Sequence, residues 1–333
     1  MTTVDVHAHA HFLELDPIVA NAKGLIDEIA SAPSKFGQAS LDLNQKLFKE
    51  SWCRSLTDPT ARKLAMNEGG IDVQIVSVSP LQYHYWADRK LAADVTKVTN
   101  LGIAKTVASN PKHLFGLATV SLQHPDLMVS QLEYAVRELG MVGVEIGTHA
   151  GGRDFSSPDF EPFWAAAAAL DVAIFIHPWG CTLDDRLQNY YLGNVIGNPV
   201  ETSVALSHII FSGILDRHPT LRICSAHGGG YLPHYISRSN HAYDVRPESR
   251  SMKERPSQYL KKMWFDSLVF DKQTLRALIS AVGANRVVIG SDYPFDMGVA
   301  NPVARLLELT ELSEHDRNAV SGRNAIELFK LPI

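Results

Sequence analysis

The sequence is poor in cysteine and carries no large excess of charge of either sign. Its three cysteines, Cys53, Cys181 and Cys224, are odd in number and form no closely spaced pair. This pattern argues against a disulfide framework and against a cysteine zinc knuckle, so we interpret them as free thiols. The net charge of -5 over 333 residues excludes a broad basic surface of the kind that binds nucleic acid.

Long apolar runs and targeting signals are also missing. No stretch approaches the ~20 apolar residues of a membrane span. The start of the chain has no basic segment followed by an apolar run and a small-residue cleavage site. We therefore expect a cytoplasmic protein with no membrane or nucleic-acid partner. Its 45% hydrophobic and 20% charged residues are typical of a globular chain with a sizeable core.

A glycine-rich phosphate turn is absent after the first apolar segment, which argues against an open doubly wound sheet. Instead, short β-branched runs alternate with stretches of helical periodicity. Strands are predicted at about 4–9, 73–78, 114–120, 142–147, 172–177, 222–227, 264–269 and 286–292. Helices are predicted at about 58–69, 87–109, 124–139, 159–170, 200–216, 230–243, 271–283 and 301–313. Eight such strand and helix units predict an α/β fold of the (β/α)8 TIM-barrel type.

Two segments fall outside a minimal barrel. Residues 12–57 are too many for an ordinary connection and show helical periodicity around 19–29, so we expect an inserted cap after the first strand. Residues 317–331 predict a terminal helix followed by a short tail. No internal repeat or low-complexity linker divides the chain. We therefore predict a single barrel domain over residues 1–333.

Residues with metal-binding or acid/base chemistry fall where predicted strands end. Asp5, His7 and His9 alternate along the first strand, so their side chains project from one face. Because the carboxyl ends of barrel strands converge at one mouth, residues that end different strands are expected to meet there. The other candidates of this kind are His177, His227 and Asp292.

This set of side chains suits a divalent transition metal. Neutral imidazole and carboxylate groups are ligands that zinc prefers. Taken singly, each residue has an ordinary explanation, because a histidine can bond a carbonyl and Asp292 can begin a turn. Four strands that end in such groups are hard to obtain by packing alone, so we predict a metal site.

The sequence resembles the amidohydrolase superfamily, and within it the decarboxylases related to 2-amino-3-carboxymuconate-6-semialdehyde decarboxylase. The motifs that carry the resemblance are Asp-Val-His-Ala-His at 5–9, Gly-Ile-Asp-Val-Gln at 70–74, His-Pro-Trp at 177–179, His-Gly-Gly-Gly at 227–230 and Gly-Ser-Asp-Tyr-Pro-Phe at 290–295. The resemblance implies that one zinc ion, or another divalent transition metal, is held by His7, His9, His177 and Asp292. It also implies that His227 is the acid/base residue beside a metal-bound water, so that His227 and Asp292 are the catalytic pair.

The resemblance also implies a substrate-carboxylate site shared between two subunits. Arg238, in the helix after the sixth strand, would reach into the neighbouring subunit's site, which implies a homodimer. Arg246 aligns with a second arginine of the family. Trp179 and Phe295 adjoin expected ligands, so we predict that they form an apolar wall against a planar substrate.

Two positions depart from the family pattern. The arginine that the family places in its long first loop is not clearly present, because Phe-Lys-Glu at 48–50 and Trp-Cys-Arg at 52–54 occupy that region. Glu145 stands on the fourth strand where the decarboxylases carry an uncharged amide and other branches place a ligand to a second metal. We favour one metal and expect a substrate that differs from the best-known one.

We therefore expect a zinc-dependent non-oxidative decarboxylase of a carboxylated muconate semialdehyde or a hydroxy- or amino-aromatic acid. The metal would activate water, His227 would move a proton and an arginine would position the carboxylate. The alternative is a metal-dependent hydrolase or hydratase that acts on a related lactone, amide or unsaturated acid. No feature of the sequence favours a non-catalytic metal-binding barrel. A serine esterase is disfavoured because a Gly-x-Ser-x-Gly elbow is missing.

Overall fold

Eight parallel strands form a barrel in the computed structural model, which describes residues 2–333. The strands are β1 Val4–Ala10, β2 Val73–Val78, β3 Leu114–Ala118, β4 Gly143–Ile146, β5 Ala173–Ile176, β6 Arg222–Ser225, β7 Trp264–Asp266 and β8 Val287–Val288. They neighbour one another in sequence order. The backbone N–H of Val6 donates to the carbonyl of Ile289 at 2.9 Å and closes the barrel between β1 and β8. The predicted (β/α)8 fold is confirmed.

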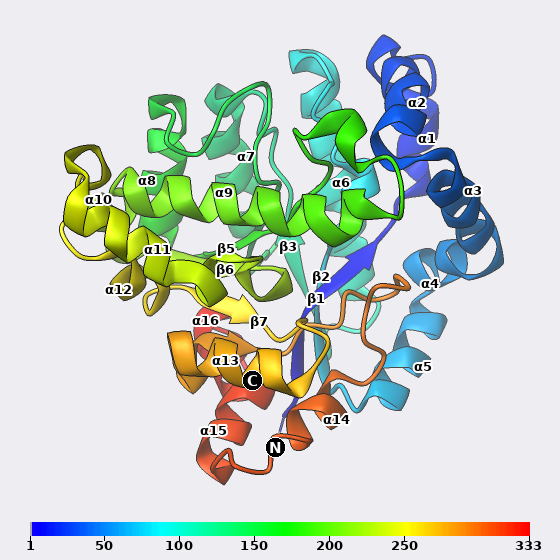
Figure 1. The fold of residues 1–333 in the computed structure, drawn as a ribbon. Coiled ribbons are helices and arrows are strands. Elements are labelled where there is room, and N and C mark those ends of the chain that lie inside the picture. The colour runs from blue at the N-terminus through cyan, green and yellow to red at the C-terminus, as the bar shows by residue number, and fades with distance from the viewer. Residues whose placement is uncertain (1) are drawn as a thin grey trace.

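Helices surround the barrel and link its strands (Figure 1). Those that follow the eight strands in turn are α5 Pro59–Gly69, α6 Arg89–Ala108, α7 Pro125–Arg137, α8 Glu161–Leu170, α9 Asn198–Phe211, α11 Leu232–Val245, α13 Lys272–Val282 and α14 Pro302–Leu307. The shorter α10 Ile214–Arg217 and α12 Pro256–Leu260 extend the connections after β5 and β6. Parallel strands need such crossovers, and the helices bury the outer faces of the strands.

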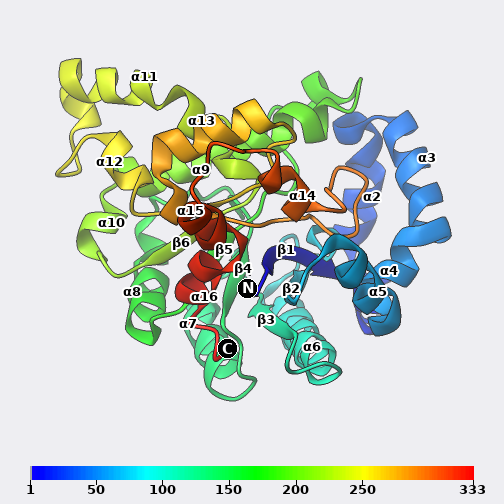
Figure 2. The ribbon, with the colours of Figure 1, turned by 90° about the horizontal axis from the view of Figure 1, so that it is seen from below.

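Apolar side chains fill the inside of the barrel because strand residues alternate between its two faces. Ile75, Leu117 and Phe175 are fully buried in one cluster that also includes Leu328 and Phe329. The latter two belong to α16 Asn324–Phe329, which follows α15 Glu314–Asn318. Figure 2 shows α15 and α16 beside the N-terminus. The predicted C-terminal helical segment therefore covers the amino ends of the strands and leaves the opposite mouth free for a site.

The predicted insertion between β1 and α5 is helical. It contains α1 Asp16–Val19, α2 Lys23–Phe36, α3 Gln38–Leu47 and α4 Cys53–Thr57. Figure 1 shows β1 running toward these helices, so they lie on the side of the carboxyl ends of the strands. The helical periodicity predicted at 19–29 corresponds to α2, which begins at Lys23 and continues to Phe36. No residue of α2 or α3 is buried, so these two helices lie outside the core, whereas Val19 of α1 and Leu56 of α4 are buried.

Several predicted elements are shorter in the structure. The backbone turns into the left-handed region at His227 (φ 52°) and Asp292 (φ 58°), so β6 and β8 end before these residues. The helix predicted at 200–216 is two helices, α9 and α10, because Gly213 between them has a φ of 72°. The helix predicted at 301–313 ends at Leu307. These differences come from turns that hydrophobic periodicity does not reveal.

Cys53, Cys181 and Cys224 are unpaired, as predicted. Among residues 2–333, no helix combines the length and apolar character needed to cross a bilayer.

An ion pair between a half-buried histidine and a buried glutamate joins the loops at the barrel mouth. Glu201 on α9 is 5% exposed, and one of its carboxylate oxygens lies 3.1 Å from Nδ1 of His149 in the loop after β4. Its other oxygen accepts hydrogen bonds from the N–H and hydroxyl of Thr182, in the loop after β5. Burial alone would raise the pKa of Glu201, but the bonds from His149 and Thr182 lower it to about 2. The hydrogen bond to Glu201 raises the pKa of His149.

We expect Glu201→Gln to lower the free energy of unfolding by about 1–3 kcal/mol near pH 5.5. Stability from the lowered pKa of Glu201 is present above about pH 4.3 and is lost as the pH falls toward 2. Stability from the raised pKa of His149 is present below about pH 6.5 and is lost at higher pH, as that imidazole deprotonates. Urea unfolding from pH 5 to 9 should therefore show that the difference in the free energy of unfolding between Glu201→Gln and the unaltered protein shrinks as the pH rises.

The matched control is Glu254→Gln, which removes an exposed carboxylate that lies 3.4 Å from Lys262. It should change stability little at any pH. A loss in Glu201→Gln that stays constant from pH 5 to 9 would contradict the proposed pair with His149.

Candidate metal centre

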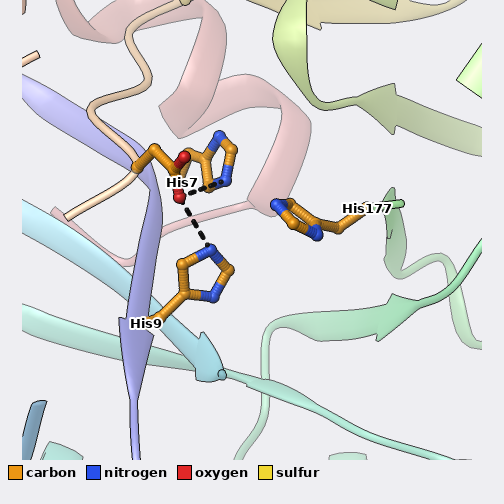
Figure 3. A group of neighbouring side chains, drawn as sticks. His7, His9 and His177 are labelled. Atoms are coloured by element: carbon orange, nitrogen blue, oxygen red, sulfur yellow. Dashed lines mark ion pairs between the residues drawn. The ribbon is translucent and has the colours of Figure 1, made fainter. Parts of the chain in front are cut away.

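Four buried side chains from three strands meet at the carboxyl end of the barrel. They are His7, His9, His177 and Asp292, and each offers a ligand atom within 4.8 Å of the others. Nε2 of His7 and Nε2 of His9 lie 3.4 Å and 3.3 Å from Oδ1 of Asp292. Figure 3 shows His7 and His9 side by side on β1, with His177 facing them from β5. The structure therefore brings together the four residues expected to hold a metal.

The two imidazoles of β1 are oriented by contacts on their far nitrogens. Nδ1 of His7 lies 2.7 Å from Oδ2 of Asp266, at the end of β7. Nδ1 of His9 lies 3.2 Å from the carbonyl of Val78 and 3.2 Å from the hydroxyl of Ser77. These bonds leave Nε2 of each ring directed to the centre, as in metal sites where a ligand histidine donates its other N–H to a second group.

His227 stands beside this group without belonging to it. Its Nε2 lies 3.8 Å from Oδ2 of Asp292, and its ring centre lies 5.1 Å from that of His177. The following Gly228 has a φ of 59°, and a Cβ there would meet a Val269 methyl at 2.3 Å, so only glycine fits. The N–H of Gly228 donates to Asp266 at 2.9 Å. The tight turn therefore holds His227 at the edge of the cluster, where an acid/base group is expected.

Burial and charge set the ionisation of these groups. Burial alone would raise the pKa of Asp292, but the charge of His7 and contacts with His227 and His9 hold it well below its usual range. Burial, together with the neighbouring imidazoles of His7 and His9, lowers the pKa of His177 well below its usual range. Asp292 is therefore a carboxylate and His177 a neutral imidazole, the forms in which each can bind a metal.

The unpartnered atoms of the cluster fit a cation. Nε2 of His7 and of His9, both ring nitrogens of His177 and Oδ1 of Asp292 are buried and make no hydrogen bond within residues 2–333. Buried polar atoms without partners are rare and need an explanation. Three imidazoles and one carboxylate are a donor set suited to zinc and other divalent transition metals. The residues present therefore fit a single divalent ion.

A second layer of polar contacts fixes the strand that carries His7 and His9. The Asp5 carboxylate accepts hydrogen bonds from the Ser291 hydroxyl at 2.6 Å and from Gln74 at 2.9 Å. Arg62, on α5 and also buried, donates to Gln74 at 2.7 Å. Together with the closure of β1 against β8, this network holds β1 in register.

Glu145 lies on β4 but outside the group of four. One of its carboxylate oxygens accepts a hydrogen bond from the Tyr83 hydroxyl at 2.9 Å, and burial raises its pKa. Tyr83 stacks on Tyr85, with ring centres 5.0 Å apart. Tyr83 therefore contacts Glu145 and does not border the cavity.

A cavity of about 270 Å³ opens above the metal-binding group and is bordered by His177, His227 and Asp292. The apolar part of its wall contains Phe48, Trp52, Leu81, Trp179 and Phe295. The polar part contains Asn44, Gln45, Tyr191, Asn194, Asn198 and Asp296. Trp179 and Phe295 thus lie where the sequence predicts. The insertion supplies residues that the sequence does not single out, since α3 contributes Asn44 and Gln45.

The two arginines expected to contact substrate are not in this wall. Arg238 is exposed on α11. Arg246 is exposed at the end of the same helix and forms an ion pair with Glu248. Within one chain, neither reaches the cavity. Their predicted role therefore depends on a second subunit.

Asp266 is the site residue that sequence reasoning missed. It binds His7 and the N–H of Gly228 and is fully buried. The predicted strand at 264–269 places Asp266 in its interior, so the strand-end rule did not single it out. In the structure β7 ends at Asp266 and brings it to the same mouth as the other candidates.

A (β/α)8 barrel with three imidazoles and one carboxylate buried at its mouth is typical of metal-dependent barrel enzymes, and this chain has that arrangement. The chain belongs to the amidohydrolase family, whose sequence profile matches residues 4–331. The resemblance noted from the sequence is therefore confirmed.

The most informative relatives are decarboxylases. The 2-amino-3-carboxymuconate-6-semialdehyde decarboxylase of Dictyostelium discoideum is 34% identical over 298 residues, 88% of this chain and 82% of that protein. The gamma-resorcylate decarboxylase of Rhodococcus jostii (strain RHA1) is 31% identical over 299 residues, 85% of this chain and 90% of that protein. The dihydroxybenzoic acid decarboxylase of Polaromonas sp. JS666, solved with manganese and the inhibitor 2-nitroresorcinol, superposes with a TM-score of 0.81 at 26% identity and covers 100% of this chain and 98% of that one.

We expect Asp266→Asn to weaken divalent-metal affinity by about 10–100-fold, because the neutral amide no longer matches the His7 imidazole that it orients. Competition against a chromogenic chelator measures this affinity. Asp126→Asn, an exposed change on α7, is the control and should leave the affinity unchanged. Equal affinities for Asp266→Asn and the unaltered protein would contradict the orienting role.

Proposed function

We propose that the protein is a metal-dependent, non-oxidative decarboxylase of a hydroxylated aromatic acid. The observation that carries this proposal is the buried group of His7, His9, His177 and Asp292 under an aromatic-walled cavity, with His227 at its edge. The similarity to decarboxylases of muconate semialdehydes and of dihydroxybenzoic acids supports the reaction class. The aromatic side chains of Trp179 and Phe295 in the cavity wall favour an intact ring as substrate.

We propose zinc as the resident ion, because three imidazoles and a carboxylate are its common ligands. Manganese, which the Polaromonas decarboxylase binds, is the competing ion. A divalent ion at this position supplies Lewis-acid polarisation of a substrate oxygen. Elemental analysis of protein purified without added metal identifies the ion.

The chain's own residues position the ring and move the proton. Trp179 and Phe295 stack against the ring and exclude water from the floor of the cavity. The bond between the ring carbon and its carboxylate breaks and carbon dioxide leaves. The electron pair left on that carbon takes a proton from Nε2 of His227, which then regains a proton from solvent. Asp292, 3.8 Å away, stabilises the charged imidazole.

The functional unit that we propose is a homodimer of single-domain chains. α11 carries the exposed Arg238, and nearby Tyr231 and Tyr235 are 44% and 63% exposed. Large exposed aromatic side chains of this kind are typical of protein interfaces. A neighbouring chain seated there could bring its Arg238 to the cavity. The unpaired cysteines support a reducing, cytoplasmic location.

Carbon dioxide release tests the reaction class. We expect metal-loaded protein to release one carbon dioxide per molecule of a hydroxybenzoate substrate, and protein treated with a chelator to release none. Isotope-labelled carboxylate allows the gas to be counted. Turnover of a lactone or amide in the same panel, with no carbon dioxide from any acid, would contradict the proposal and favour a hydrolase.

Two substitutions separate metal binding from proton transfer. His227→Ala should keep the metal and lose about 10²–10⁴-fold in kcat, since His227 lies beside the metal-binding group and not in it. Asp292→Ala should lose most of the metal as well, because it removes the only carboxylate of the group. Metal content and turnover are measured on the same samples. Full activity in either variant would refute the roles assigned here.

A further inference from the structure

We propose that an aromatic substrate first binds in a second cavity, between α3 and residues 184–192, and passes from there to the metal-binding group. This cavity has a volume of about 880 Å³, and Leu43, Tyr190 and Tyr191 are part of its wall. We refer to it as the access groove. The inference rests on the proposed function, because it describes how the substrate of that reaction arrives.

Three residues border both the access groove and the cavity at the barrel mouth. They are Asn44 on α3, Tyr191 in the loop after β5 and Asp296 after β8. Because the two cavities share these walls, they adjoin one another at this point. A ring that leaves the groove past the shared residues therefore arrives in the cavity that His227 and Asp292 border.

Apolar side chains with large exposed fractions belong to both sides of the access groove. Leu43 on α3 is 50% exposed, and Tyr190 in the loop after β5 is 91% exposed. Neither side chain contributes to the core. A planar ring in the groove can stack on the Tyr190 ring and cover apolar surface of Leu43, and both contacts are favourable. The groove therefore offers a binding site for an aromatic molecule outside the metal centre.

The loop that carries the two tyrosines has an unusual backbone. Tyr190 and Tyr191 are consecutive non-glycine residues with φ of 58° and 60°. The left-handed region disfavours residues with a Cβ, and such residues are concentrated where proteins bind ligands. The bend between α2 and α3 packs directly against this loop, because a Cβ at Gly37 would collide with the carbonyl oxygen of Gln188. The insertion and the loop thus hold both tyrosines at the groove.

Two other cavities adjoin the mouth but suit the passage of substrate less well. One, of about 350 Å³, shares His227 and Asp292 with the mouth and is bordered by Tyr231 on the side of α11, where we propose that a neighbouring chain sits. Figures 1 and 2 show α2 and α3 on the opposite side of the molecule from α11, so that chain would not cover the access groove. The other, of about 440 Å³, shares Asp296 and extends to the buried Asp5 behind the metal-binding group.

The rate at which 2-nitroresorcinol binds to the metal-loaded protein tests the access groove. Binding in the groove followed by passage to the mouth predicts an observed rate that saturates as the ligand concentration rises in stopped-flow measurements. Tyr190→Ala should raise the half-saturating concentration by about fivefold, because the ring loses its stacking partner in the groove. Tyr190→Phe retains the aromatic ring and should restore the value of the unaltered protein. An observed rate that rises linearly, or an unchanged half-saturating concentration in Tyr190→Ala, would overturn the inference.

A larger side chain in the groove separates a route from a final binding site. Leu43→Trp changes a residue that borders the groove and not the mouth cavity. It should lower the association and dissociation rate constants of 2-nitroresorcinol by the same factor, about tenfold, and leave Kd unchanged, because it contacts the ligand only during passage. The matched control is Val195→Trp in the cavity on the side of α11, which should change neither rate constant. Unchanged rates in Leu43→Trp, or slower rates in Val195→Trp, would overturn the inference.

Turnover distinguishes this inference from the proposed function. If hydroxybenzoates release carbon dioxide while the groove variants bind 2-nitroresorcinol at the rates of the unaltered protein, the access groove fails and the decarboxylase stands. If the variants show the expected rates and no acid in the panel releases carbon dioxide, the decarboxylase fails and the access groove stands. Absence of any binding of 2-nitroresorcinol, together with absence of carbon dioxide release, would contradict both.

Discussion

The contact between the Asp292 carboxylate and the imidazoles of His7 and His9 is the interaction on which the site depends. It lies between β1 and the turn after β8, at 3.3–3.4 Å, among side chains that are at most 8% exposed. A negative charge buried there needs a cation, and the neighbouring His177 is held neutral by burial. Nε2 of His7 and of His9 and both ring nitrogens of His177 make no hydrogen bond within residues 2–333, so a bound ion would satisfy groups that the protein leaves without partners.

The rest of the barrel keeps this contact in place. Backbone bonds between β1 and the segment after β8 set the distance between His7 and Asp292, and the Asp5 network behind them resists sliding of β1. Asp266 fixes His7 and also anchors the turn that carries His227. One buried carboxylate thus relates the position of His7, the proposed metal ligand, to that of His227, the proposed acid/base residue. The helical insertion then adds Asn44, Gln45, Phe48 and Trp52 to the cavity wall.

Local patterns in the sequence predict much of this, and contacts across the barrel account for the rest. Short β-branched and apolar runs located all eight strands, and the strand-end rule located His7, His9, His177, His227 and Asp292. Asp266 was missed because its importance comes from a through-space bond to a residue 259 positions away. The helix break at Gly213 comes from a backbone turn, which leaves no periodic signal in the sequence. The cavity position of the α3 amides comes from the packing of the insertion on the barrel mouth, which leaves no such signal either. The roles of Arg238 and Arg246 involve a second chain.

Anomalous X-ray scattering from crystals of the metal-loaded protein tests the central claim most directly. A single peak should lie among His7, His9, His177 and Asp292, within about 2.0–2.2 Å of an imidazole nitrogen of each histidine and a carboxylate oxygen of Asp292. A peak elsewhere, or a second strong peak bound to Glu145, would contradict the account of one ion held by these four residues.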